Sequence, residues 1–323
     1  MKAIVQYAYG SPEVLELKDV DAPVVGDDDV LVRVHAAGMD PGVWHVMTGK
    51  PYLVRIMGYG LRAPKAHVLG GDVAGHVEAV GKSVTQFHEG DEVFGTCRGS
   101  FAEYACAAQD KFAPKPANLT SEQAAAVPGS ALTALQGLRD KGEVRAGQKV
   151  LIIGAAGGVG TFAVQIAKAF GVEVTGVCST TKLDLVRSIG ADHVIDYTRN
   201  GFAQRGRRYD LILDTAGNRP LSHLRRALAP RGTLVLVGGE GGGRWLGGAD
   251  RWIRALALSP FVRQRLRMFI AEPRKDDLLV LKELIEAGKL TPVIDSTYTL
   301  SEVPEAIRYL EEGHARGKTV ITV

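Results

Sequence analysis

The most regular hydrophobic pattern of the chain lies between residues 150 and 171. Val150–Ile153 is wholly apolar, as expected of a parallel strand that is buried on both faces. The small residues of Gly154–Gly160 follow, and apolar residues then recur at helical spacing up to Gly171, which is placed to end a helix. The recurring residues are Val159, Phe162, Ala163, Ile166 and Phe170. The pattern predicts a strand, a glycine turn and a helix.

The first 110 residues favour β-structure. Short alternating or apolar runs are separated by Gly, Pro and Asp, as in strands that are joined by turns. The predicted strands are Lys2–Tyr7, Val14–Val20, Val30–Ala36, Gly70–Gly81, Gly90–Gly95 and Phe101–Ala107. Ala37–Gly49 mixes glycine, proline, aromatic and titratable residues, which is typical of a functional loop.

The pattern changes near Leu119. Thr120 and Gln123 form a capping box that opens an Ala-rich helix, and Pro128 separates this helix from a second one. Strands and helices then alternate, which predicts a doubly wound parallel sheet. The segments are the strands Val172–Val177, His193–Asp196, Asp210–Asp214 and Thr233–Val237, and the helix Leu183–Ile189. From about residue 261 we expect an amphipathic helix around Leu278–Gly288, another that is capped by Ser301, and a final strand, Thr319–Val323.

Composition indicates an ordinary soluble protein with room for two domains. Of its 323 residues, 46% are hydrophobic and 23% are charged, and its net charge of +3 gives no support for nucleic-acid binding. Cys97, Cys106 and Cys178 are widely spaced and form no C-x-x-C pair, which favours a reducing, cytoplasmic setting. We recognise no signal peptide and no membrane-spanning run, and we expect no membrane partner.

The glycine turn is a candidate dinucleotide-binding motif. Read as A-x-G-x-x-G, it comprises Ala155, Gly157, Gly158, Val159 and Gly160. Small residues let the backbone approach a pyrophosphate, and the N–H groups that open the helix then bind the phosphates. The motif alone is also compatible with a tight strand–helix turn, but its flanking strand and helix favour a nucleotide.

The end of the following strand favours NADP over NAD. An NAD site usually carries an Asp or Glu about 20 residues beyond the glycines, which binds the ribose 2′-hydroxyl. Cys178–Lys182 offers hydroxyls and one cation instead of a carboxylate. Ser179 and Lys182 could therefore hold a 2′-phosphate, each hydrogen bond contributing about 1.5–3 kcal/mol. Alternatively, Lys182 is only a solvated residue in the first turn of a helix.

Together these segments resemble the zinc-independent medium-chain dehydrogenases/reductases of the quinone oxidoreductase type. The resemblance is carried by Met1–Leu17, Gly90–Gly95, Ala155–Gly160, Gly190–Tyr197 and Arg316–Val323. It implies an α/β architecture with a GroES-like, β-rich catalytic domain over residues 1–124 and 261–323. A Rossmann doubly wound parallel-sheet cofactor domain is expected between them, over residues 125–260. The resemblance also implies NADPH, a small-molecule substrate in the cleft and a homodimer.

The resemblance also locates the positions at which zinc-dependent relatives bind catalytic metal. These are Asp40, the segment Gly70–Asp72 and the neighbourhood of Gly129–Ser130. The histidine of their G-H-E motif is missing from Gly70–Asp72, and their four-cysteine lobe is absent. A tetrahedral catalytic site needs three protein ligands. Asp40, His45 and Asp72 could form an oxygen/nitrogen site, but we expect no metal.

The resemblance adds side chains that contact the cofactor. Thr133 matches a threonine that faces the nicotinamide, although it could also be a helix threonine bonded to its own backbone. Ser179, Lys182 and Tyr197 match the 2′-phosphate and adenine side of the site. Tyr197 could instead be a core aromatic residue at a strand end.

A glycine-rich run is expected under the nicotinamide ribose. Gly238 and Gly239 follow a predicted strand and match the turn at that position. Because glycine has the most conformational freedom to lose, we expect residues 238–248 to be mobile without a ligand.

The expected reaction is hydride transfer from NADPH to a quinone or an α,β-unsaturated carbonyl without metal. Hydride addition leaves an enolate or hydroquinone anion, which needs a donor. The family often has Asn and Tyr where this chain has Asp40 and His45. An ionised Asp40 would repel the anion, whereas a protonated one could donate to it, and His45 is the other candidate donor. Asp40 could instead form an Asx turn before Pro41, and His45 could be a packed or surface histidine.

Two other functions are compatible with the sequence. One is an NAD(P)-dependent alcohol dehydrogenase, which would need a metal or a proton relay, and the other is an NADPH-binding protein with secondary catalysis. Basic tracts at residues 205–208 and 251–267 are interrupted by acidic and apolar residues and have no aromatic platform. We expect them to be solvated helix faces, and we expect no nucleic-acid partner.

Overall fold

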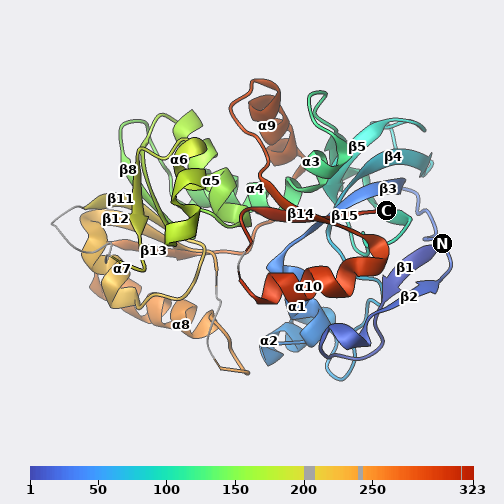
Figure 1. Cartoon of the computed structure of the whole chain (residues 1–323), viewed down its shortest axis with the longest axis horizontal. Coiled ribbons are helices and arrows are strands. Elements are labelled where there is room, and N and C mark those ends of the chain that lie inside the picture. Colours follow the sequence, from blue (N-terminus) through green and yellow to red (C-terminus); the bar gives the residue numbers. More distant parts are fainter. Residues whose placement is uncertain (200–207, 239–242, 314) are drawn as a thin grey trace. The chain divides into compact units, whose positions relative to one another are not determined.

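The computed structural model describes residues 1–199, 208–238, 243–313 and 315–323 (Figure 1). The chain forms two compact units: unit 1 comprises residues 1–132, 273–288 and 292–323, and unit 2 comprises residues 133–272 and 289–291. Both boundaries lie further along the chain than the predicted ones at 124/125 and 260/261. The first moves because α4 (Pro128–Gln136) begins in unit 1, and the second because β13 (Arg265–Met268) completes the sheet of unit 2.

Unit 2 contains the predicted doubly wound parallel sheet. Its strand order is β10-β9-β8-β11-β12-β13, and all neighbouring strands are parallel. The strands other than β13 are β8 (Lys149–Ile153), β9 (Glu173–Cys178), β10 (His193–Asp196), β11 (Tyr209–Asp214) and β12 (Leu228–Leu236). The direction of the strand order reverses between β8 and β11, which is where Rossmann sheets bind their ligands.

Helices cover both faces of this sheet, as Figure 1 shows. On one face, α5 (Gly158–Ala169) and α6 (Leu183–Ser188) pack against β8, β9 and β10. On the other, α7 (Leu221–Ala227) and α8 (Ala249–Leu258) pack against β12 and β13. Because both faces are covered, β8 is apolar and buried from Val150 to Ile153, which explains the most regular pattern in the sequence.

Unit 1 is built on a seven-stranded sheet. Its order is β14-β15-β3-β4-β5-β7, with β6 also paired to β3, and β1 and β2 form a separate antiparallel pair. The strands are β1 (Lys2–Val5), β2 (Glu16–Asp19), β3 (Asp29–Met39), β4 (Asp72–Val80), β5 (Glu92–Thr96), β6 (Tyr104–Ala108), β7 (Phe112–Pro114), β14 (Ile294–Thr299) and β15 (Lys318–Thr322). The last strands therefore join the N-terminal sheet directly beside β3.

The remaining helices correct two sequence expectations. They are α1 (Pro41–Thr48), α2 (Tyr52–Val54), α3 (Ser121–Ala125), α9 (Lys275–Glu286) and α10 (Val303–Glu311). Short 3₁₀ or π turns cover Pro12–Val14, Arg55–Tyr59, Gln109–Lys111, Gly137–Lys141, Thr180–Lys182, Ser259–Phe261 and Leu300–Glu302. The segment expected to be a functional loop is mostly helix α1, because Pro41 suits the first helical position and Gly49 ends the helix with a φ of 59°. The capping box before α10 is formed by Thr299 and Glu302 rather than by Ser301.

The capping box of Thr120 and Gln123 is present as predicted, with both reciprocal hydrogen bonds formed.

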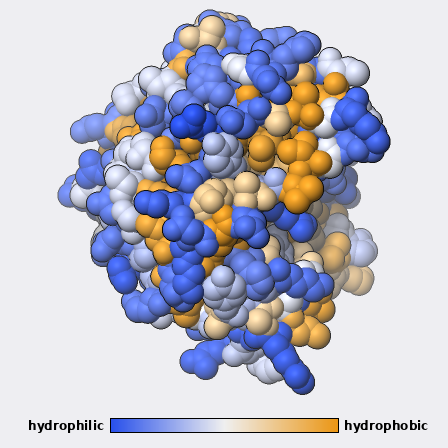
Figure 2. Space-filling model, turned by 90° about the vertical axis from the view of Figure 1, so that its right-hand side faces the viewer, coloured by the Kyte–Doolittle hydropathy of each residue, from blue (hydrophilic) through white to orange (hydrophobic). Residues whose placement is uncertain are grey.

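Over the part of the chain that the structure describes, no helix is long and apolar enough to cross a membrane. Apolar and hydrophilic side chains are interspersed on the face shown in Figure 2, as is usual for a protein surface.

Candidate active site and cofactor site

The strand register of unit 1 brings three ionisable side chains to one end of the sheet. Met39 of β3 lies opposite Thr319 of β15, so Asp40, which follows β3, adjoins Lys318, which opens β15. Asp72 opens β4 on the other side of β3. The Lys318 Nζ atom lies 2.6 Å from Asp40 Oδ1 and 3.6 Å from Asp72 Oδ2.

Helix α4 adds two polar contacts to this end of the sheet. The hydroxyl of Ser130 donates to Asp40 Oδ1 over 2.8 Å, and its oxygen lies 3.3 Å from Lys318 Nζ. The backbone N–H of Gly129 donates to Asp72 Oδ1 over 3.0 Å. A Cβ at Gly129 would lie 2.9 Å from Asp40 Oδ2 and 3.0 Å from both carboxyl oxygens of Asp72. Glycine is therefore required for α4 to meet the two carboxyl groups, and we call Asp40, Asp72, Ser130 and Lys318 the carboxylate–lysine cluster.

Burial and mutual charge set the ionisation of this cluster. The side chains of Lys318, Asp72 and Asp40 are 1%, 6% and 28% exposed. Burial opposes ionisation of Asp40, but the Lys318 ammonium and the hydrogen bonds of the cluster outweigh it, so the Asp40 pKa lies below its usual value. Burial and the Asp40 charge raise the pKa of Asp72 well above its usual value. Asp40 is thus the stronger acid of the pair, and Asp72 is the one that keeps its proton to higher pH.

His45 lies on α1 and makes its hydrogen bond outside this cluster. Its Nδ1 atom lies 2.7 Å from the carbonyl oxygen of Lys50, and its ring packs edge-on against Trp44 at 5.1 Å. Because a carbonyl oxygen only accepts, Nδ1 carries the proton, and Nε2 of the neutral ring is an acceptor. His45 can therefore donate from Nε2 only as the imidazolium.

The positions assigned to zinc ligands do come together, but around an ammonium group. Asp40, Asp72 and the Gly129–Ser130 segment all contact Lys318 or each other. Among residues 1–199, 208–238, 243–313 and 315–323, no group of three or more His, Cys, Asp or Glu side chains could hold a metal ion. Two carboxyl groups that already share a buried cation do not fit the three-ligand site of a zinc enzyme.

In unit 2, the glycine motif lies at the carboxyl end of β8, beside the reversal of strand order. Gly157 caps α5 and has no side chain to satisfy the N–H groups of the first turn. A Cβ at Gly160 would lie 2.0 Å from the carbonyl oxygen of Gly154, so the helix packs too closely there for any side chain. At Gly157 the nearest such atom, the same oxygen, would lie 3.5 Å away. The structure thus separates a glycine that is required by packing, Gly160, from one with open space beside it, Gly157.

The other members of the motif contribute in the same two ways. Ala155 is fully buried, and a Cβ at Gly176 of β9 would lie 3.1 Å from its side chain, so it supports the packing of the turn. Gly158 and Val159 lie in the first turn of α5, where backbone N–H groups have no partner within the helix.

The predicted adenosine side lies beyond β9 and β10. Ser179 precedes the turn that follows β9, Lys182 ends that turn, and both residues are half-buried. Tyr197 is 46% exposed, with the Arg219 guanidinium over its ring at 5.2 Å, so it is not the core aromatic considered as an alternative. Sequence reasoning missed Arg219, because nothing in the local sequence relates it to Tyr197.

Sequence reasoning also missed a carboxylate beside this turn. Asp196 ends β10, and its oxygens accept hydrogen bonds from Thr180 and Thr198. These bonds hold its pKa below the usual value. The parallel pairing of β9 with β10 places it there, opposite Cys178. The end of β9 carries no carboxylate of its own, but the neighbouring strand β10 places the carboxylate of Asp196 beside it.

The remaining predictions fall on α4, on the turn after β12 and on the basic tracts. Thr133 is half-buried on α4, one turn after Ser130. A Cβ at Gly238 would lie 2.1 Å from the carbonyl oxygen of Thr215, so this turn also packs against backbone. Gly239, the following residues to 242 and residues 205–207 lie outside the described residues.

Arg251 is an exception to the expectation that the second basic tract is solvated, whereas Arg254, Arg263 and Arg267 are exposed. Its guanidinium is 2.6 Å from the fully buried Asp214 at the end of β11 and also donates to the Arg219 carbonyl. This arginine therefore helps to fix α8 to the carboxyl edge of the sheet.

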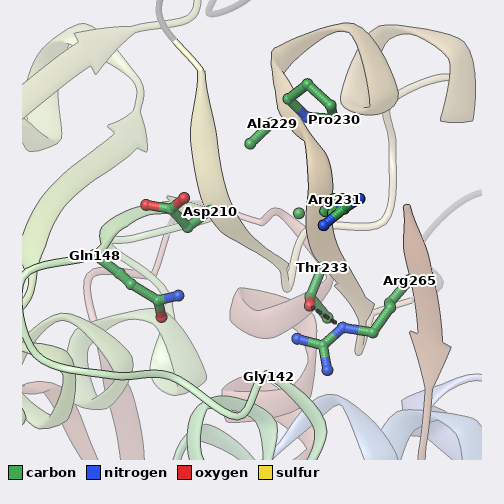
Figure 3. Close-up of a pocket in the computed structure, with 9 residues that line it drawn as sticks. Gly142, Gln148, Asp210, Ala229, Pro230, Arg231, Thr233 and Arg265 are labelled. Carbon is green, nitrogen blue, oxygen red and sulfur yellow. Dashed lines mark hydrogen bonds between the residues drawn. The ribbon is translucent and has the colours of Figure 1, made fainter. Parts of the chain in front are cut away.

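A separate pocket opens at the opposite edge of the same sheet (Figure 3). It is lined by Gln148 and Asp210, at the amino ends of β8 and β11, and by Arg265, which donates to the Thr233 hydroxyl over 3.0 Å. Because cofactors bind at the carboxyl ends of strands in such sheets, this pocket is distinct from the cofactor site.

A GroES-like sheet that is interrupted by a Rossmann sheet defines the class of medium-chain dehydrogenases/reductases. The family model "Alcohol dehydrogenase GroES-like domain" matches residues 26–117, and "Zinc-binding dehydrogenase" matches residues 189–321. The human mitochondrial NAD(P)H oxidoreductase RTN4IP1 is 37% identical over 363 residues, which cover 100% of this chain and 89% of that protein. The chloroplastic NADPH-dependent alkenal/one oxidoreductase of Arabidopsis thaliana is 34% identical over 336 residues, covering 99% and 79%.

A solved structure extends this similarity to the whole fold. The quinone oxidoreductase from Coxiella burnetii matches with a TM-score of 0.89 at 31% identity, covering 100% of this chain and 99% of that one. The chain belongs to the quinone oxidoreductase-like family of medium-chain dehydrogenases/reductases, and it is an oxidoreductase. The predicted fold class and family are thereby confirmed.

Proposed function

We propose that the protein reduces a quinone or an α,β-unsaturated carbonyl with NADPH and without a metal. The observation that carries this proposal is the open glycine turn at the start of α5, in a chain whose relatives are named as NAD(P)H, alkenal/one and quinone oxidoreductases. Bound NADPH supplies the hydride. The protein has to hold the cofactor, exclude water and stabilise the anion that forms on the substrate.

The cofactor is held by backbone along its pyrophosphate and by side chains at its ends. The N–H groups of Gly158, Val159 and Gly160 bind the phosphates, and Gly157 gives them room. Ser179 and Lys182 would bind the 2′-phosphate, and Tyr197 would contact the adenine side of the cofactor. Thr133 and the Gly238–Gly239 turn would contact the nicotinamide end of the cofactor. Asp196 does not take the role of an NAD-selective carboxylate, since its oxygens already accept bonds from threonines.

The anion formed by hydride addition is met by polar groups of unit 1. Asp40 is an unsuitable donor while ionised, but its charge is neutralised by Lys318 at 2.6 Å. His45 supplies the proton as the imidazolium, from the nitrogen that does not contact Lys50. An alcohol dehydrogenase is the weaker alternative, because it would need a metal or relay where the carboxylate–lysine cluster lies.

The proposed assembly is a homodimer through the end of the parallel sheet. In the described part of unit 2, β13 is the last strand of the sheet, and Phe261 and Ile270, which flank it, are exposed. An edge strand beside exposed apolar side chains is suited to pairing with a second copy.

We also propose a cytoplasmic location. The three cysteines are free thiols, which suits a reducing compartment. The mitochondrial and chloroplastic locations in the relatives' names are those of the relatives.

The test is a cofactor titration followed by turnover. Purified, metal-analysed protein is titrated with NADPH and NADH, and NADPH oxidation is then followed with small quinones, enones and alkenals. We expect tight NADPH binding, weak NADH binding and turnover without stoichiometric zinc. Zinc with alcohol oxidation would establish the alcohol dehydrogenase, and binding without turnover would favour an NADPH-binding protein with secondary catalysis.

A further inference from the structure

Lys318 is a buried cation with two carboxyl neighbours, and this arrangement needs a reason. Removing an ammonium group from water is costly, and a buried pair rarely stabilises a fold more than apolar residues would. The residues around Lys318 are nevertheless constrained to accommodate the buried charge. Position 129 has to be glycine because of the two carboxyl groups, and Asp72 Oδ2 has no hydrogen-bond partner among the described residues. A cluster built this tightly around one charge serves something other than stability alone.

We propose that Lys318 is a positioning residue that takes the place of a metal ion as the fixed positive charge of the active centre. Its ammonium, 2.6 Å from Asp40 and 3.6 Å from Asp72, makes the site neutral, so hydride transfer builds negative charge in a neutral rather than an anionic environment. This inference rests on the proposed function.

The groups that face the ammonium come from the end of β3, from β4 and from α4. The end of β3 leads to Asp40, β4 supplies Asp72, α4 supplies the Ser130 hydroxyl, and β15 supplies Lys318 itself. Cys97 lies just after β5. Burial raises the pKa of its thiol, and the Asp72 carboxyl raises it further. The thiol is therefore neutral. Because Asp40 loses its proton before Asp72, one negative and one positive charge are present below the pKa of Asp72, and they cancel.

The charge count predicts how the reaction responds to pH. When pH rises through the raised pKa of Asp72, the cluster gains one negative charge beside the forming anion. Only the charged transition state is affected, because a neutral quinone or enone is indifferent to that charge. The kcat of the wild-type protein should then fall by about tenfold or more to a lower plateau above this pKa, with little change in KM for the substrate.

The decisive variant is Asp72→Asn, which keeps the acceptor of the Gly129 N–H but cannot ionise. The kcat of this variant should not fall at high pH, whether its value at low pH is higher or lower than that of the wild type. Lys318→Met should lower kcat on the order of a hundredfold or fail to fold. The double variant Lys318→Met/Asp40→Asn, which removes both charges, should fold and recover at least about tenfold of that loss. Lys282→Met, which removes a surface lysine paired with Glu286, is the matched control.

A second readout needs no substrate. A carboxyl group whose folded pKa is raised loses stability as pH climbs from its unfolded value, about 3.9, through the folded value. The thermal midpoint of the wild type should therefore drop relative to that of Asp72→Asn over this range.

Two results would overturn the inference while leaving the proposed function intact. One is an active wild type whose fall of kcat at high pH and whose pH dependence of the thermal midpoint are the same in Asp72→Asn. The other is a double variant no better than Lys318→Met. If no substrate is reduced at all, the proposed function fails, and the midpoint curves still report the charge state of the cluster.

Discussion

One side chain, Lys182, carries most of the proposed discrimination between the two nicotinamide cofactors. It lies in the turn after β9, where Ser179 is the other candidate for the 2′-phosphate. An ammonium next to a phosphate acts as a point charge, and its hydrogen bonds contribute about 1.5–3 kcal/mol each. NADH, which lacks the 2′-phosphate, gains nothing from it.

Lys182→Ala should therefore weaken NADPH binding tens-fold and leave NADH binding unchanged, as measured by titration of intrinsic fluorescence. Lys149→Ala is the control, because Lys149 is exposed at the amino end of β8, at the opposite edge of the sheet. Equal losses for both cofactors, or a loss in the control, would show that Lys182 does not read the phosphate.

For single residues, the sequence identified candidate functional side chains but not the side chains that contact them. The motif around Arg316–Val323 was visible, but nothing in it indicated that Lys318 is buried against Asp40. That contact depends on the register of β15 against β3, which periodicity does not specify. Asp196 was missed for a similar reason, since it reaches the turn after β9 from the neighbouring strand.

The strand–turn–helix unit of β8 and α5 was the most predictable element. Its buried strand and helical spacing follow from having both sheet faces covered. The segment before Gly49 was less predictable, because its mixture of glycine, aromatic and polar residues obscured a helix that Pro41 and Gly49 delimit. Within the glycine turn itself, the sequence could not distinguish packing glycines from binding ones.

The two glycines of this turn can be separated experimentally. Gly160→Ala should destabilise the protein by about 2 kcal/mol or more, because its Cβ meets the Gly154 carbonyl at 2.0 Å. Gly157→Ala should leave the unfolding midpoint nearly unchanged and raise the Kd for NADPH about tenfold or more, by filling the phosphate space. Chemical denaturation and cofactor titration measure the two effects. An unstable Gly157→Ala variant with normal affinity would contradict the assignment.

For the whole molecule, the discontinuous architecture was implied by the family resemblance rather than by periodicity. Nothing in the helical pattern of the last 60 residues or so indicated that β14 and β15 join the first sheet beside β3. The boundaries shifted because β13 lies beyond the point where the texture of the sequence changes.

The proposed homodimer is also a property of this scale. Phe261→Glu combined with Ile270→Glu should convert the dimer to a monomer, since each places a charge beside the β13 edge. Light scattering after size exclusion measures the mass. Val24→Glu is the control, because Val24 is an even more exposed apolar residue of unit 1. A wild type that is already monomeric would refute the dimer.

The separation of Lys318 from its carboxyl partners has a consequence for synthesis. Asp72 leaves the ribosome about 250 residues before Lys318, which at roughly 5–20 residues per second is a delay of about 12–50 s. Until then, Asp40 and Asp72 have no cation to neutralise them, and β15, one of the strands that pair with β3, is missing. A nascent or truncated chain cannot bury these carboxyl groups together as ions, so the active centre closes only after nearly all of the sheet has been made. The lysine thereby couples assembly of the centre to synthesis of β15, the strand that carries it.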